Sequence, residues 1–100
     1  MNQFQVLAEE RRRQLLDLLL KGERTVGDLV ERLALSQPVV SKHLRVLREA
    51  GLVSARVDAQ RRLYRLCPEG LEEVKAWLEN YQTLLKPTET DDLDIAGAPV

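Results

Sequence analysis

The sequence of 100 residues is poor in the residues that most often build chemical sites, with one cysteine, Cys67, and one histidine, His43. A single cysteine excludes an internal disulfide bond and a Cys-x-x-Cys redox pair. Structural zinc takes four cysteine or histidine ligands, so we expect no metal site and no cofactor. Nucleophilic catalysis would need Cys67 and His43 to meet without a third group that orients them. There is also no glycine-rich phosphate loop, so we expect that the protein is not an enzyme.

Long apolar runs are absent as well, and none approaches the roughly 18 residues that a membrane-spanning helix needs. The N-terminus, residues 1–5, has no basic region followed by an apolar run, which is the pattern of a secretory signal. We therefore expect no secretory signal and a cytoplasmic protein. Hydrophobic residues make up 44% and charged residues 31% of the chain, which is ordinary for one globular domain. A domain of this size has a modest core, so a dimer would add stability.

The formal net charge of −1 conceals a strong asymmetry along the chain. Residues 36–66 contain seven cations and two anions, which favours a polyanionic partner for that segment. Residues 86–100 contain one cation and four anions and no aromatic residue, and we expect this tail to be disordered. The sequence therefore predicts one folded domain over residues 1–85, followed by an acidic tail.

The pattern of apolar residues predicts a mainly α fold with one β-hairpin. Helices are expected at residues 4–20, 25–34, 37–50 and 68–85, with caps at Thr25 and Ser36 and a stop at Gly51. The first of these contains no proline or glycine, although a bend near residues 8–9 stays open. Alternating residues over 52–67 predict the hairpin, and its turn lacks glycine, so we expect a loop longer than two residues.

Two short helices joined by about three residues are typical of a helix-turn-helix, whose second helix enters the major groove of DNA. At about 100° per residue, Val40, Leu44 and Leu47 share one side of this helix, and the opposite side is polar and basic. The alternative is an ordinary solvated face. The hairpin that follows carries four arginines, Arg56, Arg61, Arg62 and Arg65. The candidate DNA-binding residues are Ser36, Gln37, Pro38, Ser41, Lys42, Arg45, Arg48, Arg61 and Arg62.

These candidates differ in the part of DNA that their chemistry suits. Gln37, Ser41 and Arg45 are expected at or near the base edges, because amide and guanidinium groups match adenine and guanine. Ser36, Lys42 and Arg48 are expected at phosphates. The hairpin arginines Arg61 and Arg62 are expected on the DNA backbone or in the minor groove.

The run Ser-x-His-Leu-x-x-Leu-x-x-Ala-Gly-Leu-Val at residues 41–53, with the segments 25–29 and 62–66, resembles the ArsR/SmtB family of winged-helix bacterial transcription regulators. The likeness extends over about residues 4–85. It implies a homodimer that binds double-stranded operator DNA, usually as a repressor that an effector releases. A protein–protein interaction module without a specific DNA target is the alternative function.

The sequence departs from this family at the positions where members that sense metals carry ligands. Those members often have Cys-x-Cys in the helix before the turn, or Asp, His and Glu on the last helix. Here residues 25–30 contain no sulfur or imidazole, and residues 71–85 contain no histidine, so the resemblance is to the branch that does not sense metals. The family's Ala-Asp-Pro-Thr-Arg appears as Ala-Glu-Glu-Arg-Arg at residues 8–12. The missing proline favours a continuous first helix.

The first and last helices carry more apolar residues than one small domain can cover, which favours a dimer interface over ordinary core, as the resemblance also implies. The candidate interface residues are Phe4, Leu7, Leu71, Val74, Trp77, Leu78, Tyr81 and Leu85. His43 is expected to be half-buried and hydrogen-bonded to a neighbouring helix, with a DNA phosphate contact as the alternative. Cys67 is expected to be a packing residue, with a redox switch between subunits as the alternative.

Overall fold

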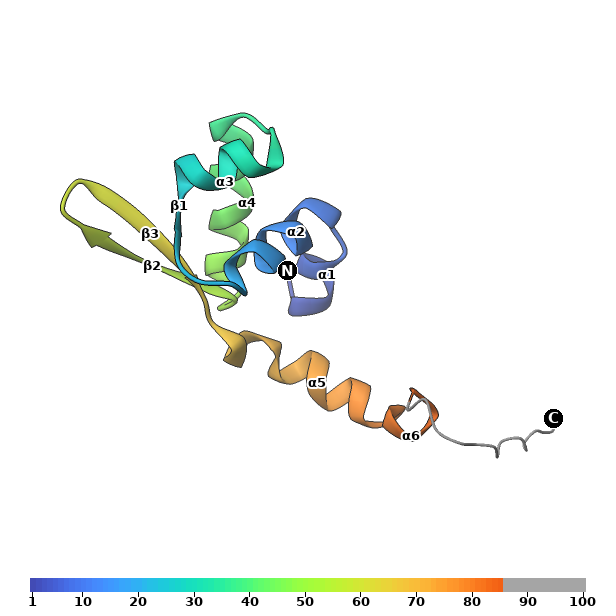
Figure 1. Ribbon diagram of the computed structural model, residues 1–100. Coiled ribbons are helices and arrows are strands. Elements are labelled where there is room, and N and C mark those ends of the chain that lie inside the picture. Colours follow the sequence, from blue (N-terminus) through green and yellow to red (C-terminus); the bar gives the residue numbers. More distant parts are fainter. Residues whose placement is uncertain (86–100) are drawn as a thin grey trace.

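The computed structural model describes residues 1–85, and the predicted acidic tail lies outside the described residues. The first four helices form the body of the molecule, a β-hairpin projects from one side of it, and the C-terminal helices lead away from the other side (Figure 1). The elements are α1 (Gln3–Leu7), α2 (Glu10–Leu19), β1 (Arg24–Thr25), α3 (Val26–Leu33), α4 (Gln37–Glu49), β2 (Val53–Asp58), β3 (Arg61–Leu66), η1 (Pro68–Leu71), α5 (Glu72–Glu79) and α6 (Gln82–Leu85).

The core lies between α2, α3, α4 and the base of the sheet. On α4 the buried residues are Val40, Leu44 and Leu47, which follow the helical spacing and confirm the apolar side predicted for this segment. Leu15 of α2 and Leu29 of α3 are fully buried against them. Each such side chain stabilises the fold by about 1.5–3 kcal/mol through the burial of apolar surface.

The sheet has three antiparallel strands in the order β1-β3-β2, and β1 was not expected from the sequence. Asp58 of β2 pairs with Arg61 of β3, so the loop between these strands is only residues 59–60. The prediction of a longer loop is therefore wrong. Ala59 turns the chain at a φ of +58° in place of glycine, and the left-handed conformation costs a residue with a Cβ about 1–2 kcal/mol. An ion pair of 3.2 Å between Arg61 Nη2 and Asp58 Oδ2 spans the turn.

The continuous helix favoured over residues 4–20 is wrong, and the alternative of a bend near residues 8–9 is confirmed, because the chain breaks between α1 and α2. Glu9 is extended, and its carboxylate accepts a hydrogen bond of 2.7 Å from the amide of Arg11, which caps α2. Arg12 Nε donates to the carbonyl of Val6 at 2.7 Å, and Arg13 Nη1 donates to that of Leu7 at 2.6 Å. These guanidinium groups satisfy the last carbonyls of α1, so the chain can turn here without a proline.

The single helix expected over residues 68–85 is also interrupted. Pro68 begins a 3₁₀ turn, η1, and α5 follows from Glu72 to Glu79. Asn80, a residue of low helix propensity, caps the end of α5 before the short α6. Gly70 of η1 lies directly against the turn that joins α4 to β2. A Cβ at Gly70 would stand 2.8 Å from the carbonyl carbon of Gly51 and 3.0 Å from Leu52 Cα, so only glycine fits.

The Gly70→Ala variant is expected to lower the free energy of unfolding by about 1–3 kcal/mol, because its methyl group must displace backbone atoms. Urea unfolding followed by circular dichroism measures this change. Glu69→Ala, at the exposed neighbouring position, is the control and should stay within about 0.5 kcal/mol of the wild type. An unchanged midpoint for Gly70→Ala would contradict the close contact.

Candidate nucleic-acid interface

The sharp connection between α3 and α4 determines which side of α4 is exposed. Ala34 ends α3 in the left-handed conformation, with a φ of 55°, and residues 34–36 lead into α4. Ser36 Oγ accepts a hydrogen bond of 3.4 Å from the amide of Val39, which caps α4, and Pro38 occupies its first turn. Because the apolar side of α4 is buried, its exposed side carries Gln37, Pro38, Ser41, Lys42, Arg45 and Arg48.

A hollow of about 430 Å³ separates the start of α4 from the starts of α3 and β3. It brings together four of the predicted DNA-binding residues: Gln37, Ser41, Arg61 and Arg62. The other predicted residues, Ser36, Pro38, Lys42, Arg45 and Arg48, are exposed at the start of α4 or along it and do not line this hollow. The remaining lining residues were not predicted, and they are Thr25, Val26, Gly27 and Tyr64.

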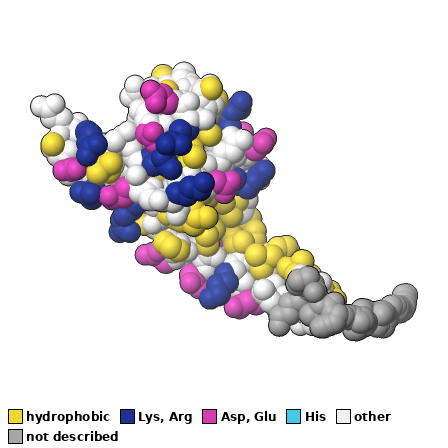
Figure 2. Space-filling model, viewed as in Figure 1, with side chains coloured by type: hydrophobic (Ala, Val, Ile, Leu, Met, Phe, Trp, Pro, Cys, Tyr) yellow, Lys and Arg dark blue, Asp and Glu magenta, His cyan; other side chains and the backbone are white. Residues whose placement is uncertain are grey.

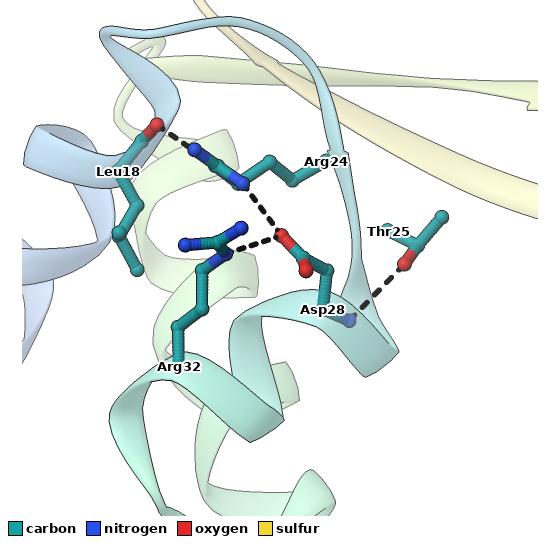
Figure 3. Close-up of polar contacts among 5 residues, drawn as sticks. All are labelled: Leu18, Arg24, Thr25, Asp28 and Arg32. Carbon is teal, nitrogen blue, oxygen red and sulfur yellow. Dashed lines mark hydrogen bonds and ion pairs between the residues drawn. The ribbon is translucent and has the colours of Figure 1, made fainter.

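A network of polar contacts holds the first turn of α3 beside this hollow (Figure 3). Thr25 Oγ1 accepts from the amide of Asp28 at 3.1 Å, as the predicted cap requires. The carboxylate of Asp28 accepts from Arg24 Nη1 at 2.8 Å and from Arg32 Nε at 3.0 Å, and Arg24 Nε donates to the carbonyl of Leu18 at 3.0 Å. The network therefore joins α3 to the end of α2 through β1.

The arginines of this network lower the pKa of Asp28 below its ordinary value, with the hydrogen bond from Arg24 as the largest cause. A similar effect occurs between β2 and the residue that precedes β1. Arg56 forms two hydrogen bonds with the carboxylate of Glu23, at 2.8 and 2.9 Å, and these lower the pKa of Glu23. Arg56 is thus engaged by the protein, unlike Arg62, which forms no ion pair within residues 1–85.

His43 lies on the flank of α4 that faces α2, and it is half-buried as expected. Its Nδ1 is 3.5 Å from Arg12 Nη1, which makes the expected contact with a neighbouring helix. Burial lowers the pKa of the imidazole, with smaller lowering contributions from Arg12, Arg11 and Lys42, whereas Glu9 acts in the opposite direction. The neutral ring therefore serves the packing of α4 on α2.

The opposite end of the molecule exposes a continuous apolar surface along α1 and α5 (Figure 2). The rings of Phe4 and Trp77 meet edge to face with centroids 5.8 Å apart, and Trp77 and Tyr81 are 5.1 Å apart. These three side chains remain 40%, 49% and 45% exposed, respectively. The predicted interface residues Leu78 and Leu85 are exposed, and Leu7, Leu71 and Val74 are half-buried.

Within residues 1–85, no three His, Cys, Asp or Glu side chains are grouped so that they could hold a metal ion. Cys67 is half-buried at the end of β3, where its amide donates to the carbonyl of Leu52 at 2.8 Å. In the same part of the chain, none of the helices combines the length and the apolar character that crossing a membrane requires.

Comparison with known proteins agrees with this architecture. Residues 9–55 match the family described as "Bacterial regulatory protein, arsR family". The chain is 40% identical over 80 residues to the HTH-type transcriptional regulator Rv2034 of Mycobacterium tuberculosis, covering 80% of this chain and 75% of that protein. It is 47% identical over 76 residues to the transcriptional activator HlyU of Vibrio cholerae, covering 76% of this chain and 68% of HlyU.

The solved structure of a "Possible transcriptional regulator for arsenical resistance" superposes with a TM-score of 0.74 at 40% identity, over 89% of this chain and 99% of that one. The consecutive helices α3 and α4, with the hairpin β2–β3, form a winged helix-turn-helix, a DNA-binding fold. The chain belongs to the arsR family of bacterial transcriptional regulators, which are DNA-binding proteins and not enzymes.

The Asp28 network is expected to lower the free energy of unfolding as the solution becomes acidic. Because the pKa of Asp28 is lower in the folded state than its ordinary value of 3.8, its contribution is present above that pH. The contribution is lost as the pH falls through the lower, folded pKa. Asp28→Asn should therefore lose less stability than the wild type between about pH 6 and pH 2.5 in urea unfolding experiments.

Asp17→Asn is the matched control, because Asp17 is exposed and forms no ion pair within the described part of the chain. It should retain the acid dependence of the wild type. An Asp28→Asn variant that lost stability in parallel with the wild type would show that the network does not depend on the charge of Asp28.

Proposed function

We propose that the protein is a homodimeric regulator that places α4 in the major groove of an operator, with the β2–β3 hairpin on the flanking DNA. The observation that carries this proposal is the division of α4 into two sides. Three apolar residues bury one side in the core, and the other side exposes amide, hydroxyl and guanidinium groups. Gln37 and Ser41 on that side share one hollow with the hairpin residues Arg61 and Arg62.

Each exposed residue of α4 has a proposed contact. Gln37, Ser41 and Arg45 follow one another at intervals of four residues along the exposed side, so they can reach neighbouring base edges. Ser36 caps the start of the helix, Lys42 lies to one side of this row, and Arg48 continues it toward the C-terminal end of α4. We propose that these three residues contact phosphates along the groove. Arg61 and Arg62 would hold the hairpin on the backbone or in the minor groove. Pro38 shapes the first turn and packs beside the DNA.

The homodimer rests on the apolar surface of α1 and α5. Phe4, Trp77 and Tyr81 form one aromatic cluster whose rings are each nearly half exposed, and a second copy of the chain would cover them. Aromatic clusters of this kind dominate the energetics of protein interfaces. A twofold dimer would present two α4 helices to half-sites about one helical turn, ~34 Å, apart.

We also propose that this regulator belongs to the branch without metal sites and acts as a repressor. The described residues contain no triad of metal ligands. One structural relative is named for arsenical resistance, so titration with arsenite and zinc during a DNA-binding measurement tests the first part. HlyU is named as an activator, so a reporter assay with the protein present and absent must determine the direction of regulation.

Fluorescence anisotropy with duplex DNA from the protein's own upstream region tests the function directly. A scrambled duplex and several salt concentrations are the controls. Selective, salt-dependent binding of two subunits to each site would support the proposal. Weak and equal binding to both duplexes calls for selection of a target from random DNA. If selection finds none, or if no duplex binds even at low salt, the protein–protein interaction module is favoured.

The Arg45→Ala variant is expected to weaken operator binding by about 1–3 kcal/mol and to relax base preference at one position of each half-site. The lost contacts are those of a guanidinium to a base edge. Anisotropy with a set of single-base operator variants measures this preference. Arg11→Ala, which removes the same charge from an exposed position on α2, should leave the preference intact. An equal loss on operator and scrambled DNA would assign Arg45 to phosphate instead.

The Leu78→Glu variant is expected to shift the protein from dimer to monomer, because it places a charge in the proposed interface at a residue that is 39% exposed. Sedimentation velocity at micromolar protein measures the mass. Ala76→Glu adds the same charge about 200° around α5 and should leave the dimer intact. A wild-type protein that sediments as a monomer would refute the dimer.

A further inference from the structure

The hollow between α3, α4 and β3 is lined by a largely buried tyrosine whose hydroxyl forms no hydrogen bond within residues 1–85. Tyr64 is only 8% exposed and is the most buried of the residues that line the hollow. The side-chain hydrogen bonds of the β2–β3 hairpin join Arg56 to Glu23 and Arg61 to Asp58, and none within residues 1–85 involves the Tyr64 hydroxyl. Hydroxyl groups of largely buried residues are nearly always hydrogen-bonded, so this hydroxyl is free to donate to a group that enters the hollow.

The first turn of α3 supplies further unpaired donors to the same hollow. Val26 and Gly27 are the first two residues of this eight-residue helix, and both line the hollow. Thr25 Oγ1 accepts from Asp28, but the amides of Val26 and Gly27 have no acceptor within the described part of the chain. Such amides, together with the helix dipole, favour an anion at the start of a helix.

Glycine at position 27 is not required by the fold. Gly27 is exposed, and a Cβ added to it would meet only Thr25 Oγ1, at the ordinary contact distance of 3.9 Å. Alanine is also the better helix former. A glycine at such a position allows a ligand to approach the backbone closely.

The charges around the hollow are predominantly positive. Residues two apart on a strand share one face, so Arg62 lies on the same face of β3 as Tyr64. The carboxylate of Asp28 is neutralised by Arg24 and Arg32, and that of Asp58 is paired with Arg61. The guanidinium of Arg62 has no such partner among the described residues.

We propose that this hollow binds one phosphate group through the Tyr64 hydroxyl, the amides of Val26 and Gly27, and the guanidinium of Arg62. The proposal rests on the proposed function, because the backbone of the operator is the first source of such a group. The contact would fix α3 and the hairpin to one position on the DNA strand beside the groove that α4 enters. It carries no base information, so it acts alike on all sequences.

Two variants remove parts of this site without breaking contacts of the fold. Tyr64→Phe removes the hydroxyl, and Gly27→Ala places a methyl group beside the amides. Each should weaken binding to operator and scrambled duplex alike, by about tenfold, while the urea midpoint stays the same or rises. Arg62→Ala should also lower the salt slope of binding by about one unit. Glu31→Ala, at an exposed position of α3, is the control and should bind as the wild type does.

A scan of single methylphosphonate substitutions along the duplex then locates the phosphate. One position in each half-site should weaken wild-type binding but have little further effect on Tyr64→Phe, since a shared contact can be lost only once. Inorganic phosphate, titrated at constant ionic strength and followed by the amide signals of Val26 and Gly27, tests a free anion as the source. If those signals shift while no methylphosphonate position couples to Tyr64, the site binds the free anion.

The outcomes separate this site from the function as a whole. If the wild type binds DNA and both Tyr64→Phe and Gly27→Ala bind equally well, the phosphate site is refuted and the operator-binding function stands. If neither the methylphosphonate scan nor inorganic phosphate couples to these residues, the site is likewise refuted. A wild-type protein without affinity for any DNA or for phosphate would refute both proposals.

Discussion

The burial of Val40, Leu44 and Leu47 is the constraint on which the rest of the structure depends. These three side chains fasten one side of α4 to α2 and α3, so the polar side has only one direction in which to face. The same burial brings the end of α4 against the sheet, where Leu52 and Val53 continue the core into the hairpin. The exposed side of α4 and the hairpin therefore lie at fixed positions on one scaffold, as a surface that must match a rigid duplex requires.

Arginine performs three different tasks in this protein, and only its surroundings distinguish them. Arg12 and Arg13 bond carbonyl groups and thereby end a helix. Arg24 and Arg56 bond carboxylates and hold β1 to α3 and to the hairpin. Arg62 lacks such partners within residues 1–85 and is available for a ligand. Within the basic segment 36–66, Arg56 is thus bonded within the fold, whereas Arg62 is not.

The sequence was sufficient to predict the elements that depend on local spacing. The caps at Thr25 and Ser36, the apolar side of α4 and the hairpin all follow from residues a few positions apart. The failures involve partners that are distant in the chain or conformations that a residue type only tolerates. Ala59 adopts a positive φ that usually requires glycine, and no residue near it in the sequence predicts this conformation.

The candidate site was predictable to the same extent and for the same reason. The exposed residues of α4 could be read from one helical period, but the contributions of Thr25, Gly27 and Tyr64 to the hollow could not. They come from three elements that meet only in the folded chain. The alternating pattern of β3 predicted that Tyr64 lies in a strand, but it could not predict that the tyrosine hydroxyl has no partner within the described residues.

The contact between Gly70 and the turn after α4 has a mechanical consequence. It leaves no space between the backbone of η1 and that of Gly51, so α5 begins on a rigid support at the very end of α4. In the proposed dimer, a rotation of α5 about this contact would move α4 as well. A small change in the angle at which the two α5 helices cross would then change the distance between the two α4 helices. An effector bound at the dimer interface would in this way lower the affinity for DNA without contacting the DNA-binding surface.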